Sequence, residues 1–186
     1  MGQEARDAGE EAPQERDLAQ DALEASDEAW AAVFDGLALS SVRTIRAALP
    51  FLRKAEWARI VNVSAMSTKR QSPSLIAYTA AKSALTSLTK NLAQTLAPEG
   101  ILVNTVSPGT FATASFKEAL AELPGVDEND LHDVMRFIGE GFGHHVFLDR
   151  AADPDEIGPV IAFAASARNT YMTGANINVD GGSDFT

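Results

Sequence analysis

The amino-acid sequence predicts an α/β fold in which a parallel sheet lies between layers of helices. Three short apolar runs rich in β-branched residues are typical of buried strands, at 59–64, 101–107 and 175–179. Stretches with helical periodicity separate these runs, and parallel strands need such crossover connections. We therefore expect one sheet with helices packed on both of its faces.

The first predicted helix begins at Ser26, a good N-cap residue. Asp27 and Glu28 follow it, and the helix dipole favours acids at that end. Its apolar face is wider than one contact with a sheet needs, and it ends before Pro50. The residues of this face are Trp30, Val33, Phe34, Leu37, Leu39, Val42, Ile45, Ala48 and Leu49.

A second helix is predicted from about Ser74 to Ala97, and it carries Tyr78 and Lys82. Positions four apart lie one above the other on a helix, so the phenol and the ammonium are held side by side. A nearby positive charge favours phenolate and lowers a phenol pKa from about 10. The pair is a candidate proton donor and acceptor for alcohol–ketone interconversion. The helix also has an apolar stripe for the core, formed by Ala81, Leu85, Leu88, Leu92 and Leu96.

The second strand is stopped by Pro108-Gly109, and the region that follows is the least regular. Two short helices are predicted there, at 116–123 and 130–138. The last helix starts at Asp153-Pro154-Asp155-Glu156, where the N-cap aspartate and the glutamate can form a capping box. Pro159 removes an amide donor early in this helix, so we expect a local kink.

The order of strand, loop, helix with Tyr and Lys, strand and Pro-Gly resembles the short-chain dehydrogenase/reductase family, in particular its 3-oxoacyl-carrier-protein reductases. The stretch from Tyr171 to Gly182, YMTGANINVDGG, is similar to the closing strand of that family. The resemblance runs from about Ser26 to the C-terminus and implies a partial Rossmann-type fold, with a doubly wound, mainly parallel sheet. We expect residues 1–25 to be an acidic, flexible segment and residues 26–186 to be the C-terminal part of such a domain.

The resemblance implies an oxidoreductase that transfers hydride between NAD or NADP and a secondary alcohol or ketone. Tyr78 would exchange the proton, while Lys82 would lower its pKa and hold the cofactor ribose. Pro108 and Gly109 would let the backbone approach the nicotinamide, with Thr113 bonding the carboxamide. The segment after Pro-Gly would form a lid over the substrate.

The family also implies a homo-oligomer, a dimer or a tetramer, because its members pair the two long helices with their counterparts in a second subunit. Burial of the wide face within the chain's own core is the alternative. Both arrangements account for the apolar pattern of the first helix.

Two positions depart from the family pattern. The serine that polarises the substrate carbonyl usually lies thirteen residues before the tyrosine, and this position is Ala65. Ser64 takes its place if the strand end twists, and Ser67 is the other candidate. The family's helix asparagine, part of its proton relay, falls at Leu37.

A third departure concerns the cofactor. A dinucleotide needs a glycine-rich turn between a strand and a helix N-terminus, and Gly139–Gly143 has no strand before it. Asp7-Ala8-Gly9 is similar to the turn after the family's fourth strand, so the chain is expected to lack the N-terminal glycine-rich part. The competing hypothesis is therefore a catalytically inactive fragment or pseudoenzyme that acts only through dimerisation. A truncated gene model of an active enzyme reconciles both.

Composition limits the partners and the compartment. The chain has 186 residues, 45% of them hydrophobic, which suits one soluble domain. A formal net charge of -11 disfavours nucleic acid and anionic membranes as partners. No apolar run approaches the roughly 20 residues that span a bilayer, and no signal peptide is recognisable, so we expect a cytoplasmic protein. With no cysteine, and with His132, His144 and His145 expected at the surface, no metal site is predicted.

Overall fold

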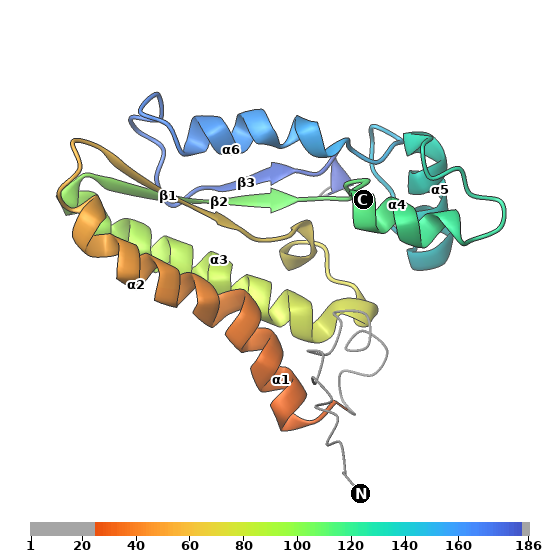
Figure 1. The fold of residues 1–186 in the computed structure, drawn as a ribbon, viewed down its shortest axis with the longest axis horizontal. Coiled ribbons are helices and arrows are strands. Elements are labelled where there is room, and N and C mark those ends of the chain that lie inside the picture. The colour runs from red at the N-terminus through yellow and green to blue at the C-terminus, as the bar shows by residue number, and fades with distance from the viewer. Residues whose placement is uncertain (1–24, 184–186) are drawn as a thin grey trace, which may run out of the picture.

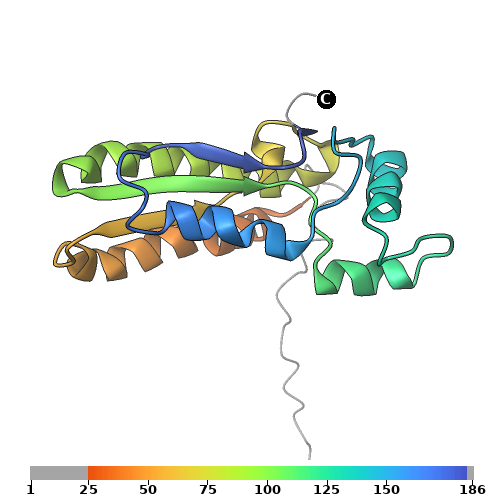
Figure 2. The ribbon, with the colours of Figure 1, turned by 90° about the horizontal axis from the view of Figure 1, so that it is seen from above.

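The computed structural model describes residues 25–183 and contains a three-stranded parallel sheet with helices on both faces (Figures 1 and 2). The predicted α/β fold class is confirmed. The strands lie in the order β1 (Ala58–Val63), β2 (Ile101–Pro108) and β3 (Asn176–Val179). The expectations for the acidic N-terminal segment and for Asp7-Ala8-Gly9 concern residues that lie, apart from Ala25, outside the described part.

Helices cover the two faces of the sheet unequally. One face carries α1, η1, α2 and α3, whereas α6 covers the other (Figures 1 and 2). The helices are α1 (Asp27–Phe34), the π-helical η1 (Asp35–Leu39), α2 (Ser40–Leu52), α3 (Ile76–Leu96), α4 (Ala114–Ala121), α5 (Leu131–Phe142) and α6 (Gly158–Ala164). Short 3₁₀ turns are η2 (Met66–Thr68), η3 (Pro73–Leu75), η4 (Ala97–Glu99) and η5 (Pro154–Glu156). In the described range, no helix combines the length and apolar character needed to cross a membrane.

The first predicted helix is one helical run with a π segment inside it. Ser26 is its N-cap, as predicted, and its side chain accepts a hydrogen bond from the Ala29 amide at 3.3 Å. A π turn places one extra residue in the helix, and here it separates α1 from α2. Pro50 does not end the run, because α2 continues through it to Leu52.

The main core lies between the sheet and the helices α2 and α3. Alternate residues of β1 and β2 point at these helices. The core residues are Ile45, Ala58, Ile60, Ala93, Leu96, Ile101 and Val103, with Leu49, Leu52 and Leu92 packed against them. The predicted stripe on α3 is confirmed for Ala81, Leu85 and Leu96.

The strand register brings three loops to one edge of the sheet. Val63 pairs with Val106, and Pro108 pairs with Val179. The carboxyl ends of β1, β2 and β3 therefore meet, and in open α/β sheets ligands bind at this edge.

Gly109, directly after β2, lies against the residue that follows β3. Its amide donates to the Val179 carbonyl at 2.9 Å. A Cβ at position 109 would lie 2.7 Å from the Asp180 Cα and 2.9 Å from its Cβ. This close approach of two backbones requires glycine.

We expect Gly109→Ala to lower the free energy of unfolding by about 1–3 kcal/mol, because the new methyl group overpacks the contact with Asp180. Gly36→Ala is the matched control, since a Cβ there meets nothing within 4 Å. Denaturant unfolding of the two variants measures the difference. Equal losses of unfolding free energy in both variants would show that the contact between Gly109 and Asp180 does not cause the destabilisation.

Residues 110–152 form a small body of their own beyond the carboxyl ends of the strands (Figure 1), which we call the lid. The two predicted short helices are present as α4 and α5. They enclose a second core, formed by Ala112, Leu120, Val134 and Ala151, with Phe116, Val126, Leu131 and Phe137 packed against it. The ends of the lid are tied together by a bridge between Phe111 and Ala152. The Ala112 amide donates to the Ala152 carbonyl, and the Ala152 amide to that of Thr110, both at 2.9 Å.

The last predicted helix is divided into η5 and α6. The capping box between Asp153 and Glu156 is present, as predicted. The helical run changes from 3₁₀ to α geometry just before Pro159, which lies in the first turn of α6. A proline in the first turn leaves no hydrogen bond of the helix interior broken, and the kink expected at Pro159 stays a prediction.

Candidate active site

Tyr78 and Lys82 lie side by side on the first turns of α3. The Lys82 Nζ is 5.5 Å from the centroid of the Tyr78 ring. The same Nζ donates a hydrogen bond to the Val63 carbonyl at 3.0 Å, at the carboxyl end of β1. Both side chains are half-buried. The helical spacing thus gives the predicted juxtaposition and places it at the sheet edge where ligands bind.

Small residues let this end of α3 approach the sheet. Ala77 and Ala81 are 2% and 0% exposed, respectively. With the helix so close, a long side chain one turn along can reach the end of β1, as Lys82 does. The alanines therefore help to position the Tyr78–Lys82 pair.

Ser64 and Ser67 are both buried, and both hydroxyls contact α3. The Ser64 Oγ is 3.1 Å from the Lys82 carbonyl and 2.9 Å from the Thr86 Oγ1. The Ser67 Oγ accepts a hydrogen bond from the Thr79 Oγ1 at 3.0 Å. In this arrangement Ser64 joins β1 to α3, and Ser67 joins the following loop to the same helix.

Ala65 continues the extended backbone of β1, with φ -154° and ψ 153°. Successive side chains on an extended chain point to opposite faces. The methyl group of Ala65 therefore faces away from the side on which the Ser64 hydroxyl meets α3. A methyl group offers no hydrogen-bond donor at the position of the family's serine.

Leu37 lies in the π-helical segment η1, which packs against α3. π segments often occur at functional sites. The position that the resemblance assigns to the relay asparagine is therefore marked by an irregular helix, although leucine supplies no polar group.

The predicted cofactor contacts lie at the same sheet edge. Pro108 ends β2, Gly109 follows it, and Thr113 is the exposed N-cap residue of α4. The Thr113 Oγ1 is 3.4 Å from the Ser115 Oγ. Lys82 thus lies at the carboxyl end of β1, Pro108 and Gly109 lie at that of β2, and Thr113 lies at the base of the lid.

The family resemblance assigns these residues to one end of a nicotinamide dinucleotide. Tyr78 and Lys82 have the hydrogen-bonding groups that a ribose would need, and the backbone at Pro108-Gly109 has no bulky side chain beyond the proline ring. The described residues have no site for the pyrophosphate, because residues 25–183 contain no glycine-rich turn between a strand and a helix N-terminus. The described residues also contain no cluster of three or more side chains suited to a metal ion.

The expectation that all three histidines lie at the surface is wrong for His144. His132 and His145 are exposed, but His144 is 8% exposed. Its Nε2 is buried and has no hydrogen-bond partner among the described residues. Burial lowers the pKa of His144, Arg70 and His145 lower it further, and Asp180 opposes them. No sequence signal distinguishes His144, which is buried, from its exposed neighbour His145.

We expect the free energy of unfolding to fall as the pH drops below 6.5, the ordinary pKa of histidine. The unfolded chain then binds a proton that folded His144 resists, and the loss levels off below the lowered pKa of the folded state. His144→Gln should flatten this part of the stability profile, whereas His132→Gln, at an exposed position, should not. Urea unfolding above and below pH 6.5 measures the free energy of unfolding. If its pH dependence is the same in His144→Gln as in the wild type, His144 is not the group responsible.

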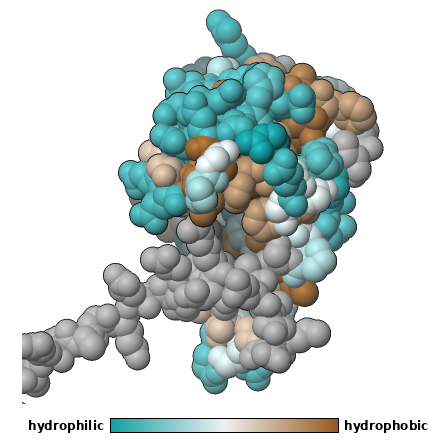
Figure 3. Space-filling view, turned by 90° about the vertical axis from the view of Figure 1, so that its right-hand side faces the viewer, coloured by the Kyte–Doolittle hydropathy of each residue, from teal (hydrophilic) through white to brown (hydrophobic). Residues whose placement is uncertain are grey.

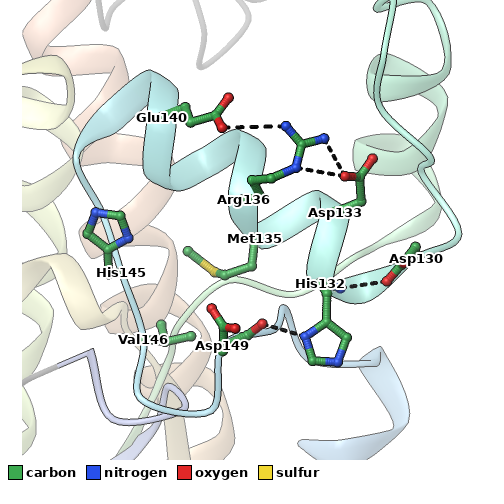
Figure 4. A pocket seen from close by; sticks show the side chains of 9 residues that line it. All are labelled: Asp130, His132, Asp133, Met135, Arg136, Glu140, His145, Val146 and Asp149. Carbon is green, nitrogen blue, oxygen red and sulfur yellow. Dashed lines mark hydrogen bonds and ion pairs between the residues drawn. The ribbon is translucent and has the colours of Figure 1, made fainter.

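A pocket of about 450 Å³ lies on the lid, between α5 and the segment that follows it (Figure 4). Arg136 forms ion pairs with Asp133 and Glu140. The Asp130 carboxylate accepts from the His132 amide, and the His132 Nδ1 is 2.6 Å from the Asp149 backbone carbonyl. The lining residues are Asp130, His132, Asp133, Met135, Arg136, Glu140, His145, Val146 and Asp149. None of the predicted site residues lines this pocket.

The lid end of the molecule presents hydrophilic and apolar side chains together (Figure 3). Phe142, Phe147 and Leu148 are exposed there, at 57%, 71% and 61%. They follow or end α5, on the lid rather than on the sheet.

Residues 11–184 match the family model described as enoyl-(acyl carrier protein) reductase. An oxidoreductase of Sarocladium schorii, asL5, is 34% identical over 76% of this chain. An acetoacetyl-CoA reductase of Allochromatium vinosum is 36% identical over 82% of it. The chain spans about half the length of these relatives, 51% and 56% respectively.

Solved structures of similar fold are also oxidoreductases. A short-chain oxidoreductase of Pseudomonas aeruginosa, described as containing an atypical catalytic center, is 28% identical with a TM-score of 0.76. The match covers 86% of this chain and 60% of that one. L-Sorbose reductase of Gluconobacter frateurii, complexed with NADPH and L-sorbose, is 27% identical with a TM-score of 0.75, over 88% of this chain and 61% of its own.

Proposed function

Because the chain belongs to the short-chain dehydrogenase/reductase family, we propose that it carries the proton-transfer centre of a cytoplasmic oxidoreductase. The reaction moves hydride between NAD or NADP and a secondary alcohol or ketone. The observation that carries this proposal is the Lys82 Nζ at 5.5 Å from the Tyr78 ring, at the carboxyl ends of the strands. In this proposal the lid beyond these ends would cover the bound substrate.

Each residue has a definite task in this proposal. The Tyr78 hydroxyl gives a proton to the carbonyl oxygen during reduction and takes it back during oxidation. The Lys82 ammonium favours the phenolate by its charge and holds the ribose hydroxyls. The cofactor, when bound, supplies or accepts the hydride. Pro108, Gly109 and Thr113 would face the nicotinamide.

Ser64 has a supporting task rather than a direct one. Its hydroxyl contacts the Lys82 carbonyl and Thr86, so it holds the turn of α3 that carries Lys82 against the end of β1. The proposal therefore assigns the chemistry to Tyr78 and Lys82. NADPH is the first cofactor to test, since the L-sorbose reductase structure contains it.

A second candidate function is association alone, in an inactive member of the family. Ala65 and Leu37, which cannot supply the polar groups expected there, favour this candidate. We propose a homo-oligomer in either case. Leu39 and Phe51 on the outer run of η1 and α2 are 46% and 75% exposed, which supports pairing of these helices with a second copy.

Fluorescence titration of the purified 186-residue chain with NADPH and NADH tests the proposal. Saturable binding in the micromolar range that Lys82→Met weakens, while Lys54→Met at an exposed position does not, would support it. No binding at millimolar cofactor would favour the inactive member.

A further inference from the structure

The lid has a core of its own and both of its ends at one place. Its core is separate from the main core, since none of its buried residues belongs to the cluster between the sheet and α2–α3. Its two ends meet at the Phe111–Ala152 bridge. A body with its own core and with both ends at one place can rotate about that place without losing its internal packing.

Contacts far from this bridge hold the lid against the sheet edge. The Arg70 Nη2 donates to the Gly143 carbonyl at 2.9 Å, across 73 positions of sequence. The Leu148 amide donates to the Gly181 carbonyl at 3.1 Å. Both lie on residues 143–148, which follow α5.

Arg70 stands on the loop that leads from β1 to α3, and therefore to Tyr78. This loop is attached to α3 by the hydrogen bond from Thr79 to Ser67. The hydrogen bond from Arg70 to the lid therefore couples the position of the lid to that of α3, which carries Tyr78.

The carbonyl that Arg70 binds belongs to the C-cap of α5. Gly143 adopts the left-handed conformation, with φ 62°, and its amide donates to the Gly139 carbonyl at 3.0 Å. Carbonyls at a helix C-terminus carry partial negative charge, so they favour a cation. The bond is charge-assisted, and it lies at an exposed position.

Residues near this contact pack against the turn that follows β3. A Cβ on Gly182 would lie 3.1 Å from the Phe147 Cβ, and one on Gly181 would lie 3.4 Å from the Val146 Cβ. His144, between these contacts and Gly143, is buried. The turn after β3 and residues 144–147 are therefore in contact, with the tightest approach at Gly182.

We propose that Arg70 is a positioning residue that holds the lid closed beside Tyr78 by its hydrogen bond to the C-terminal cap of α5. The inference rests on the proposed function for its consequence in turnover. A closed lid excludes water and holds the substrate carbonyl where the tyrosine proton can reach it. Arg70 itself does not exchange a proton in this scheme.

Hydrogen exchange measured by mass spectrometry tests the contact without any need for activity. Arg70→Gln should speed exchange about tenfold in residues 138–148, since it removes a charge-assisted bond, and should leave exchange in α3 and β2 unchanged. Arg70→Lys should restore much of the protection, because an ammonium can also donate to one carbonyl. Arg46→Gln, at an exposed position on α2, is the matched control.

Wild-type exchange in residues 138–148 of Arg70→Gln would overturn the inference. If the intact chain is active, Arg70→Gln should raise KM several-fold with a smaller fall in kcat, and Arg70→Lys should recover KM. Unchanged kinetics in Arg70→Gln would also overturn it. An inactive intact chain with faster exchange in Arg70→Gln would instead reject the proposed function and uphold the hydrogen bond from Arg70 to the lid.

Discussion

Tyr78→Phe is expected to reduce ketone turnover with NADPH by about 100- to 10,000-fold, because it removes the group that delivers the proton in the transition state. The ring itself stays, so its contact with the Lys82 ammonium at 5.5 Å is retained. Cofactor binding should therefore change little while kcat falls.

Tyr171→Phe is the matched control for this loss. Tyr171 is 98% exposed, so removing its hydroxyl should leave both turnover and the free energy of unfolding unchanged. The measurement is kcat from initial rates, with the unfolding midpoint as a check of the fold. Turnover that persists in Tyr78→Phe would mean that another group supplies the proton.

Ala65→Ser is expected to increase turnover, by up to about 100- to 1000-fold, the usual value of one oxyanion donor. The extended backbone at position 65 directs the side chain away from the contact between Ser64 and α3. The family resemblance assigns a hydroxyl at this position to the substrate carbonyl. Because serine adds a single oxygen to a site that is 8% exposed, we expect the fold to accept it.

The control for this gain is Ala84→Ser, at an exposed position on α3, which should leave the rate unchanged. Initial rates over a range of substrate concentrations separate kcat from KM, and the gain should fall on kcat. An unchanged rate in Ala65→Ser would contradict the account of position 65 and would show that the chain already has a donor for the carbonyl.

The local signals in the sequence predicted the elements well. Runs such as 59–64 and 101–107 are β-branched and uninterrupted, and the structure has strands at Ala58–Val63 and Ile101–Pro108. The juxtaposition of Tyr78 and Lys82 was predictable because it depends only on the pitch of one helix.

Features that depend on distant packing were not predictable. The direction of the Ser64 hydroxyl depends on where α3 crosses β1, and the burial of His144 depends on how the lid folds back onto the end of β3. The hydrogen bond from Arg70 to Gly143 joins residues 73 positions apart, and no local sequence pattern predicts it. The π segment at Asp35–Leu39 has no sequence signature that would distinguish it from ordinary helix.

The transfer of deuterium from NADPH deuterated at both C4 positions of the nicotinamide to a ketone tests most directly whether hydride transfer occurs and depends on Tyr78. The account predicts an alcohol labelled at its carbinol carbon from the intact chain, and almost none from Tyr78→Phe under the same conditions. An intact chain that yields no labelled alcohol at saturating ketone and millimolar cofactor would contradict it.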